Sequence, residues 1–321
     1  MSSIADLGAI VERIKSKAAD VEIVWESEAW RASLGTSPPR HISVLDSSFN
    51  PPTLAHLSLA LVSPTNAEDD KGPTSSDHIA HLLLLSVRNA DKGLKPGDAS
   101  LAQRLQMMIL LAEEMETRLS AAAASTSNAS NRRPHPVAVA TIDEPTFVGK
   151  SKKLLKHFRR TYPNHNPDVV AAYAHAQMPR LTFVLGYDTL IRLFNPKYYG
   201  SHDDMTTSLH AFFHDDRSSI ICARRSSEGL ESTLTLANAT SNGEEITFLQ
   251  SSDVEPYVRT GAMLMFDIDS AEATLSSTLV RRSIASMTGT PPDLPARDWR
   301  NMVPSTVAAY ITSQSLYISK G

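Results

Sequence analysis

Short apolar runs alternate with longer amphipathic stretches along most of this chain. The apolar runs have the length of buried strands and lie at 41–45, 80–87, 137–142, 181–185 and 219–223. The stretches between them carry apolar residues at helical spacing, at 53–62, 100–119, 150–160 and 189–194. Strands that alternate with helices pair in parallel through right-handed crossovers. The pattern therefore predicts an α/β fold with a Rossmann-like, doubly wound parallel sheet.

The two ends of the chain differ from this regular pattern. Residues 4–18 read as an amphipathic helix, and Pro38 and Pro39 then break the chain, so we expect residues 1–40 to form an N-terminal helical extension. One α/β domain then spans 41–321. Its later part contains two short strand candidates and two helices, at 246–249, 263–266, 277–287 and 304–312. The low-complexity stretch at 120–136 is expected to be a flexible insertion within that domain.

Composition narrows the function classes. The 321 residues carry a formal net charge of −4, which gives no general field for nucleic acid or an anionic membrane. No apolar run approaches the roughly 20 residues of a membrane helix. Cys222 is the only cysteine, which favours a reducing compartment. Because no targeting signal is recognised, we expect a cytoplasmic or nuclear protein. The eleven histidines lack metal-site spacing, so no protein-held metal is expected. A homo-oligomer is neither required nor excluded.

Ligands of doubly wound sheets bind at the carboxyl ends of strands, so the segments that follow strands are the first places to look for chemistry. Residues 47–56 (SSFNPPTLAH) join the first strand of the domain to a helix. Thr53 and His56 are three residues apart and face the same side of that helix. A hydroxyl and an imidazole there could donate to charge developing on phosphorus. The alternative is that Thr53 caps the helix and His56 is an ordinary, partly buried histidine.

Two later segments can also be interpreted either as ligand-binding sites or as ordinary helix starts. Gly186 lets a ligand approach the backbone after the strand at 181–185, and Asp188 could accept from a sugar hydroxyl or a base amine. Asp188 could equally be a helix cap in a plain turn. Near residue 277, consecutive hydroxyls open a helix and Arg281 lies one turn further on, which suits an anion. The alternative there is a capped, solvated basic helix.

Two common catalytic motifs are not supported. Gly149, Lys150 and Ser151 resemble the end of a P-loop, but Glu144 stands where the loop requires its first glycine. The chain also contains no G-x-S-x-G nucleophile elbow.

Together, the segments resemble the nucleotidyltransferase superfamily with (H/T)-x-G-H and I-S-S-T-x-x-R motifs. Within it the chain is most similar to nicotinamide mononucleotide adenylyltransferases, in particular a divergent fungal group. The resemblance runs over roughly residues 41–318 and rests on seven stretches in family order: 47–56 (SSFNPPTLAH), 89–94 (NADKGL), 103–108 (QRLQMM), 185–190 (LGYDTL), 221–224 (ICAR), 275–281 (LSSTLVR) and 302–311 (MVPSTVAAYI).

The resemblance implies both a reaction and roles for individual residues. The reaction is adenylyl transfer from ATP, with Mg²⁺, to nicotinamide mononucleotide, giving NAD⁺ and pyrophosphate. His56 would stabilise charge at the α-phosphorus, assisted by Thr53. The remaining residues divide between ATP and its phosphates (Ser48, Phe49, Ser277, Thr278, Arg281, Gly186 and Asp188) and the acceptor nucleotide (Asn50, Lys92, Phe147 and Arg224).

One departure from the family pattern leaves alternatives open. Ser47 stands where the family has a glycine, and its side chain could crowd a phosphate that approaches the backbone. A related nucleotidyltransferase or ATP hydrolase with another phosphorylated acceptor is therefore one alternative. A nucleotide-binding regulatory protein that has lost turnover is the other. The pair of His56 and the 277–281 segment favours an enzyme, because an adaptor has no mechanical need for both.

Overall fold

A single sheet organises the structure, a computed structural model that describes residues 3–36, 39–62, 79–88, 97–124, 135–161, 179–224, 237–268, 270–286 and 298–318. Over these residues the sheet has seven strands in the order β1-β4-β3-β2-β5-β6-β7. Neighbouring strands are parallel except β1, which pairs antiparallel with β4. The strands are β1 (Val21–Glu26), β2 (His41–Asp46), β3 (Ile79–Ser86), β4 (Val137–Ile142), β5 (Arg180–Gly186), β6 (Ser219–Ala223) and β7 (Met263–Phe266).

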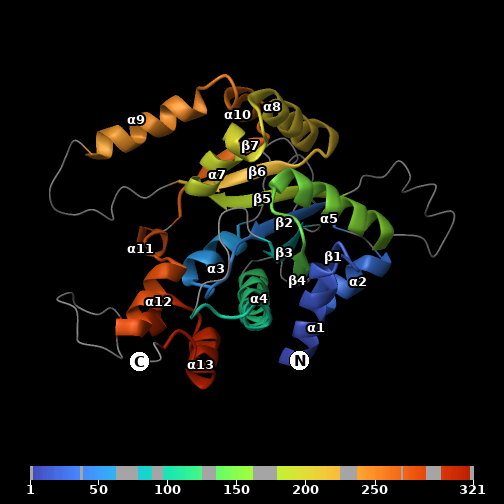
Figure 1. Ribbon diagram of the computed structural model, residues 1–321, viewed down its shortest axis with the longest axis vertical. Coiled ribbons are helices and arrows are strands. Elements are labelled where there is room, and N and C mark those ends of the chain that lie inside the picture. The colour runs from blue at the N-terminus through green and yellow to red at the C-terminus, as the bar shows by residue number, and fades with distance from the viewer. Residues whose placement is uncertain are drawn as a thin grey trace.

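Helices cover both faces of the sheet, as Figure 1 shows, so the predicted doubly wound α/β architecture is confirmed. The longer helices are α1 (Ile4–Lys15), α2 (Glu28–Thr36), α4 (Leu101–Ala124), α5 (Phe147–Thr161), α8 (His202–His210), α9 (Ala237–Leu249), α12 (Ser277–Ser286) and α13 (Ser305–Ser313). The shorter ones are α3 (Leu54–Ala60), α7 (Tyr187–Leu193), α10 (Glu255–Arg259) and α11 (Ser270–Ala273). Within these described ranges, no helix combines the length and apolar character that crossing a membrane requires.

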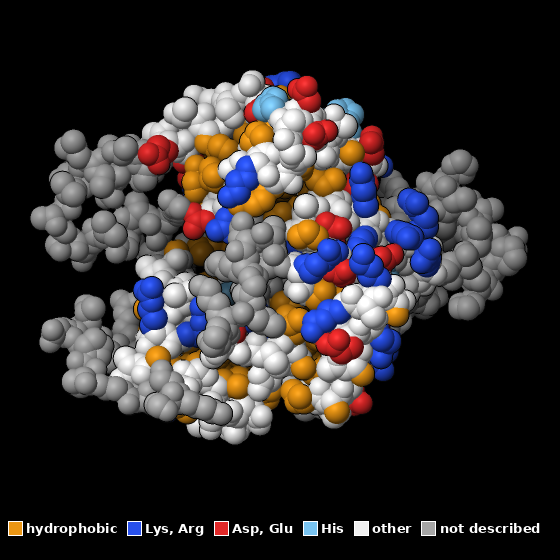
Figure 2. All heavy atoms as spheres, viewed as in Figure 1, with side chains coloured by type: hydrophobic (Ala, Val, Ile, Leu, Met, Phe, Trp, Pro, Cys, Tyr) orange, Lys and Arg blue, Asp and Glu red, His pale blue; other side chains and the backbone are white. Residues whose placement is uncertain are grey.

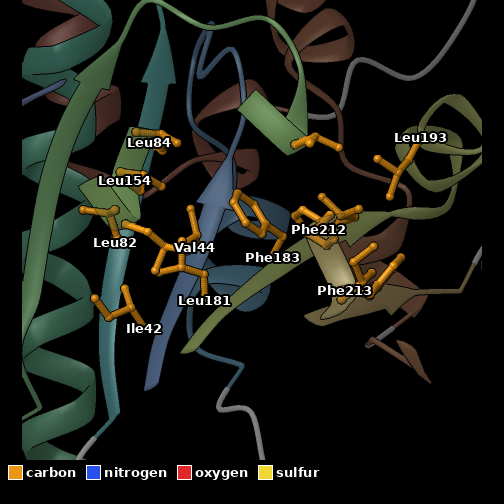
Figure 3. Close-up of a cluster of buried hydrophobic side chains, with 14 of the residues drawn as sticks. Ile42, Val44, Leu82, Leu84, Leu154, Leu181, Phe183, Leu193, Phe212 and Phe213 are labelled. Atoms are coloured by element: carbon orange, nitrogen blue, oxygen red, sulfur yellow. The ribbon is translucent and has the colours of Figure 1, made fainter. Parts of the chain in front are cut away.

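Alternation along the strands divides the core between the two faces. Val44 and Leu84 point into one cluster with Phe183 and Phe212, shown in Figure 3, beneath α5 and α7. Their chain neighbours Leu45, Leu83 and Leu85 point to the other face, where α1, α3 and α4 pack. A third cluster joins α12 and α13 to α4. Because the central strands are buried on both faces, they read in the sequence as continuous apolar runs.

The N-terminal extension differs from its prediction. Its first helix is confirmed as α1, but residues 21–26 form the edge strand β1, so the segment is not purely helical. Two glutamates interrupt the apolar residues of this strand (VEIVWE), and its two buried residues, Val21 and Val24, belong to the core clusters on opposite faces of the sheet. The segment therefore extends the sheet that carries the rest of the chain.

The strand candidate at 246–249 is wrong, because these residues end helix α9. In a strand, residues 246 and 248 would lie on the same face. Instead, Ile246 is 54% exposed while Phe248 and Leu249 pack against the core. A helix separates residues two apart and keeps 248 and 249 on adjoining positions of one face.

Candidate active site

The carboxyl edge of the sheet gathers the segments singled out in the sequence. β2 pairs with β3 on one side and β5 on the other, so the strand order reverses direction at β2. Ligands of open α/β sheets bind at such a switch point. Residues 47–53 leave β2 there and enter α3, and β5 ends beside them at Gly186. Helix α12 reaches the same loop by hydrogen bonds to Asn50 and Pro51.

Helix α3 begins with a reciprocal cap between the two residues predicted to act together. Thr53 is the N-cap, and its side-chain oxygen accepts from the backbone N–H of His56 at 3.4 Å. In return, the backbone N–H of Thr53 donates to Nδ1 of His56 at 3.1 Å, and the Thr53 hydroxyl lies 2.8 Å from the same nitrogen. Here a histidine fills the place that Glu or Gln takes in the usual capping box. Thr53 therefore caps the helix, as the alternative interpretation expected, and the same contacts also orient the imidazole of His56.

These contacts fix the protonation state of His56. A backbone N–H can only donate, so Nδ1 must present its lone pair to Thr53. The neutral ring then carries its proton on Nε2. Burial lowers the pKa of His56 to about 4, so the neutral form prevails at physiological pH. Nε2 lies 3.0 Å from the hydroxyl oxygen of Ser47, the residue that follows β2 by one position.

The loop beneath His56 is held in an uncommon conformation. Phe49 has a positive φ of 43°, which bulky residues rarely adopt, and its side chain is fully buried. Its ring centroid lies 5.2 Å from that of His56. The Phe49 ring therefore packs in the core beside the imidazole, with the two ring planes tilted by 43°. Such conformations concentrate at functional loops, where packing holds them in place.

Helix α12 is joined to this loop by two side chains predicted to bind phosphates. Ser277 donates from Oγ to the carbonyl oxygen of Pro51 at 2.7 Å, and Arg281 donates from Nη1 to the carbonyl oxygen of Asn50 at 2.5 Å. Thr278 is exposed, and its hydroxyl lies 3.5 Å from Nη2 of Arg281. The three side chains therefore lie together, beside the segment that carries His56.

Asp98 and Arg104 form an ionic cluster with Arg281 that the sequence spacing did not reveal. Asp98 lies 3.8 Å from Arg281 Nε and 3.3 Å from Arg104 Nη2. Arg104 also donates to the carbonyl oxygens of Ala99, at 2.9 Å, and Ser48, at 3.5 Å. The only sequence signal for this cluster is the resemblance of residues 103–108 to a family helix. The cluster joins α4 and α12 to the loop at residues 47–53 through charges that are buried or partly buried.

Asn50 links the same loop to the end of the chain. Its side chain is buried, and Oδ1 accepts from the Tyr317 hydroxyl at 2.9 Å and from the Ala99 backbone N–H at 3.3 Å. These two bonds use both lone pairs of that oxygen. Any contact of Asn50 with an acceptor nucleotide therefore falls to its amide nitrogen.

The other predicted residues occupy the same edge of the sheet or fall outside the described part. Gly186 is the N-cap of α7, and the exposed Asp188 lies in the first turn of that helix. Phe147 opens α5 and packs edge-on against Phe183, with ring centroids 5.6 Å apart. Arg224 follows β6 and is paired with Glu245 at 3.0 Å and Asp267 at 3.4 Å. Lys92 lies outside the described residues.

The structure also explains the P-loop-like sequence. Lys150 is buried, and its ammonium donates to Asp46 at the end of β2 at 2.5 Å while lying 4.9 Å from the centroid of the Phe147 ring. Its charge is therefore neutralised inside the fold. This agrees with the exclusion of a P-loop, whose lysine must face the phosphates.

The remaining cations of α5 lie on the surface, where Figure 2 shows blue side chains interleaved with red ones. Lys153 lies 3.6 Å from Asp20 and 3.8 Å from Glu144, and Lys156 lies 3.3 Å from Asp20. These pairs make this part of α5 a mixed-charge face. Across the described residues, no group of three or more His, Cys, Asp or Glu side chains is placed to hold a metal ion.

Fold and site together define an α/β protein of the doubly wound class with a candidate site at the switch point of its sheet, and it can be compared with known proteins. The chain is similar to the "Putative nicotinamide mononucleotide adenylyltransferase" of Schizosaccharomyces pombe, with 31% identity over 189 residues, which are 59% of this chain and 55% of that protein. The match thus spans about half the length of the relative. It confirms the resemblance that the motifs indicated. No family model matches the chain.

Among solved structures, the chain is similar to the Plasmodium falciparum nicotinic acid mononucleotide adenylyltransferase complexed with APC. The two share 12% identity over 87% of this chain and 97% of that one, with a TM-score of 0.38. The fold class therefore rests on the strand order and pairing observed in this chain itself.

Proposed function

We propose that this protein transfers the adenylyl group of ATP to nicotinamide mononucleotide, giving NAD⁺ and pyrophosphate. The observation that carries the proposal is that one loop holds both groups: it leads into His56, whose proton is fixed on Nε2, and its carbonyl oxygens accept hydrogen bonds from Ser277 and Arg281. Arg281 supplies a fixed positive charge, while neutral His56 supplies a preorganised N–H. Phosphoryl chemistry needs these groups more than it needs a carboxylate base.

The reaction requires alignment and charge stabilisation. A 5′-phosphate oxygen of the acceptor attacks the α-phosphorus of ATP in line, and the bond from that phosphorus to the bridging oxygen breaks. Pyrophosphate leaves with Mg²⁺, which enters as part of the MgATP substrate. A phosphate monoester at neutral pH is already a nucleophile, so no group on the protein has to remove a proton. Orientation and electrostatic stabilisation are then the main sources of rate.

In this proposal the residues act in two groups. Thr53 orients His56, whose Nε2–H favours the more negative phosphate of the transition state over that of the bound substrate. Ser277, Thr278 and Arg281 hold the departing β- and γ-phosphates. Backbone and side-chain groups of Ser48, Phe49, Gly186 and Asp188 line the ATP site, and the acceptor contacts are assigned to Asn50, Lys92, Phe147 and Arg224.

The acceptor assignment rests on the name of the curated relative together with the partly exposed aromatic ring of Phe147 at the sheet edge. That ring can stack on a planar base. Action in the cytoplasm or nucleus is part of the same proposal.

Product analysis tests the proposal. The purified protein is incubated with MgATP and either nicotinamide or nicotinate mononucleotide, and the products are separated by anion-exchange chromatography. We expect a dinucleotide and pyrophosphate in equal amounts. Inorganic phosphate with no dinucleotide would instead identify an ATP hydrolase. ATP binding with no turnover on either acceptor would support the regulatory alternative.

A further inference from the structure

Ser47 occupies a position in the site that the roles assigned so far leave unexplained. Its hydroxyl oxygen lies 3.0 Å from Nε2 of His56, on the opposite side of the imidazole from Thr53. Because Thr53 donates its backbone N–H to Nδ1, the ring proton is on Nε2 and points at Ser47. Ser47 is therefore the acceptor in this bond.

The direction of this bond leaves the proton of the Ser47 hydroxyl available. A serine hydroxyl has one proton and two lone pairs, and the bond from His56 uses only a lone pair. Across the described part of the chain, the Ser47 side chain has no hydrogen-bond partner besides His56. The residue is partly exposed, one position beyond the carboxyl end of β2. Its hydroxyl proton can thus point toward a ligand at the switch point.

We propose that Ser47 is a catalytic residue that accepts a hydrogen bond from His56 and donates its own proton, in a second hydrogen bond, to a phosphate oxygen of the nucleotide. The inference rests on the proposed function and deepens it. We call these two consecutive hydrogen bonds the relay. No proton is transferred and no covalent bond forms within it. A hydroxyl that accepts a hydrogen bond is polarised and becomes a stronger donor. Neutral His56 would therefore act on the phosphate through one intervening oxygen atom.

In this arrangement Ser47 transmits the hydrogen bond of His56 to the phosphate. A glycine at position 47 would instead leave Nε2 to contact the ligand directly. With a side chain present, the phosphate lies one hydrogen-bond length further from the imidazole. The Ser47 side chain, which the sequence analysis expected to crowd a phosphate, thus instead moves the phosphate contact from the imidazole to the serine hydroxyl. The relay requires that removal of either Ser47 or His56 break the same chain of bonds, so the two losses are not additive.

A double-mutant cycle tests the relay. Turnover is measured for wild type, Ser47→Ala, His56→Ala and the double variant, with Ser47→Thr retaining the hydroxyl. Ser313→Ala is the matched control, because Ser313 is exposed and bonds only within α13. We expect Ser47→Ala to lower kcat about 100-fold, as loss of one transition-state donor does. The double variant should be within about threefold of the slower single variant.

Two results would overturn the relay. If Ser47→Ala is as fast as wild type or faster, the serine merely competes with the phosphate for His56. If His56→Ala keeps its full cost in the Ser47→Ala background, His56 acts on the phosphate without Ser47. Thermal unfolding of each variant, compared with Ser313→Ala, confirms that the losses are not losses of fold.

A binding measurement separates failure of the relay from failure of the proposed function. If wild type transfers no adenylyl group, the affinity for MgATP is measured by calorimetry on the same variants. The relay predicts about tenfold weaker binding for Ser47→Ala, the loss of one hydrogen bond, with Ser47→Thr close to wild type. Such a result retains the relay and rejects only the transfer reaction. Unchanged affinity in Ser47→Ala overturns the relay itself.

Discussion

The guanidinium of Arg281 donates to the backbone carbonyl of Asn50 at 2.5 Å, which ties helix α12 to the loop that leaves β2. The two residues are 231 positions apart in the chain. Their bond connects the segment that carries His56 with the segment predicted to hold the departing phosphates. Arg281 is partly exposed and has five N–H donors in all, so it can bind this carbonyl and still meet an anion.

Replacing Arg281 tests this double role. We expect Arg281→Ala to weaken MgATP binding by at least about tenfold, because a hydrogen bond to a charged group contributes about 1.5–3 kcal/mol. Calorimetry measures the affinity directly. Arg281→Lys is the control that keeps the charge but not the planar fork, and it should fall between wild type and alanine. Unchanged affinity in Arg281→Ala would mean that α12 does not face the triphosphate.

Gly186 offers a test in which binding and folding separate cleanly. Its φ of −86° suits any residue, and an added Cβ would meet no described atom within 4 Å. Gly186→Ala should therefore leave stability within about 0.5 kcal/mol of wild type. If the nucleotide passes close to this backbone, the same methyl group should weaken ATP binding several-fold.

Gly8 in α1 is the matched control for this substitution, since it has similar open space far along the chain from the site. Gly8→Ala should leave nucleotide affinity unchanged. Equal affinities in Gly186→Ala and wild type would show that no ligand approaches Gly186 closely.

Two tyrosines near the C-terminus provide another matched pair. Tyr317 donates to Asn50, whereas the buried Tyr310 hydroxyl has no partner among the described residues. Tyr317→Phe leaves Oδ1 of Asn50 short of one donor, so we expect a loss of about 1–3 kcal/mol in the free energy of unfolding. Tyr310→Phe breaks no bond and should be neutral or stabilising. Urea unfolding of both variants makes the comparison, and equal losses would contradict it.

Acid should destabilise the fold through two histidines, His81, which is buried, and His56, which is partly buried. Burial lowers the pKa of His56 and of His81 to about 4, from an ordinary value of 6.5. The unfolded chain therefore binds protons near pH 6.5 that the folded chain does not yet bind. Stability is complete above pH 6.5 and is lost as pH falls toward 4, by at most about 1.4 kcal/mol per pH unit for each histidine.

Urea unfolding at pH 7.5, 6 and 5 measures this loss. His81 lies on β3, where Nδ1 is 2.9 Å from the Ala60 carbonyl oxygen. His81→Gln cannot take up the proton, so its stability should depend less steeply on pH. An equal slope in wild type and His81→Gln would exclude His81 from the acid response.

Much of the fold could be predicted because β2, β3 and β4 are buried on both faces. Burial of that kind demands continuous apolar runs, and helices between them leave a 3.6-residue period. The edge strand β1 lacked this signal because glutamates interrupt it. Residues 246–249 misled for the opposite reason, since a short apolar run reads equally as a strand or as a buried helix end.

In the candidate site, contacts between residues close in sequence could be predicted, whereas contacts between distant residues could not. The pairing of Thr53 with His56 follows from spacing within one helix turn, so the sequence contained it. The partnership of Asn50 with Tyr317, and of Asp98 with Arg281, joins residues far apart in the chain, and no local pattern encodes such contacts. Ser47 was visible as a departure from a family motif, but only the structure shows its oxygen on Nε2 of His56.

The central claim is that His56 acts in adenylyl transfer, and one coupled assay tests it most directly. Wild type and His56→Ala are supplied with MgATP and nicotinamide mononucleotide, and NAD⁺ is read out through alcohol dehydrogenase. We predict NAD⁺ formation by wild type and a kcat at least ~100-fold lower in His56→Ala, with the folded state intact by circular dichroism. Near-normal turnover in His56→Ala, or no NAD⁺ from a wild-type protein that binds ATP, would contradict the account.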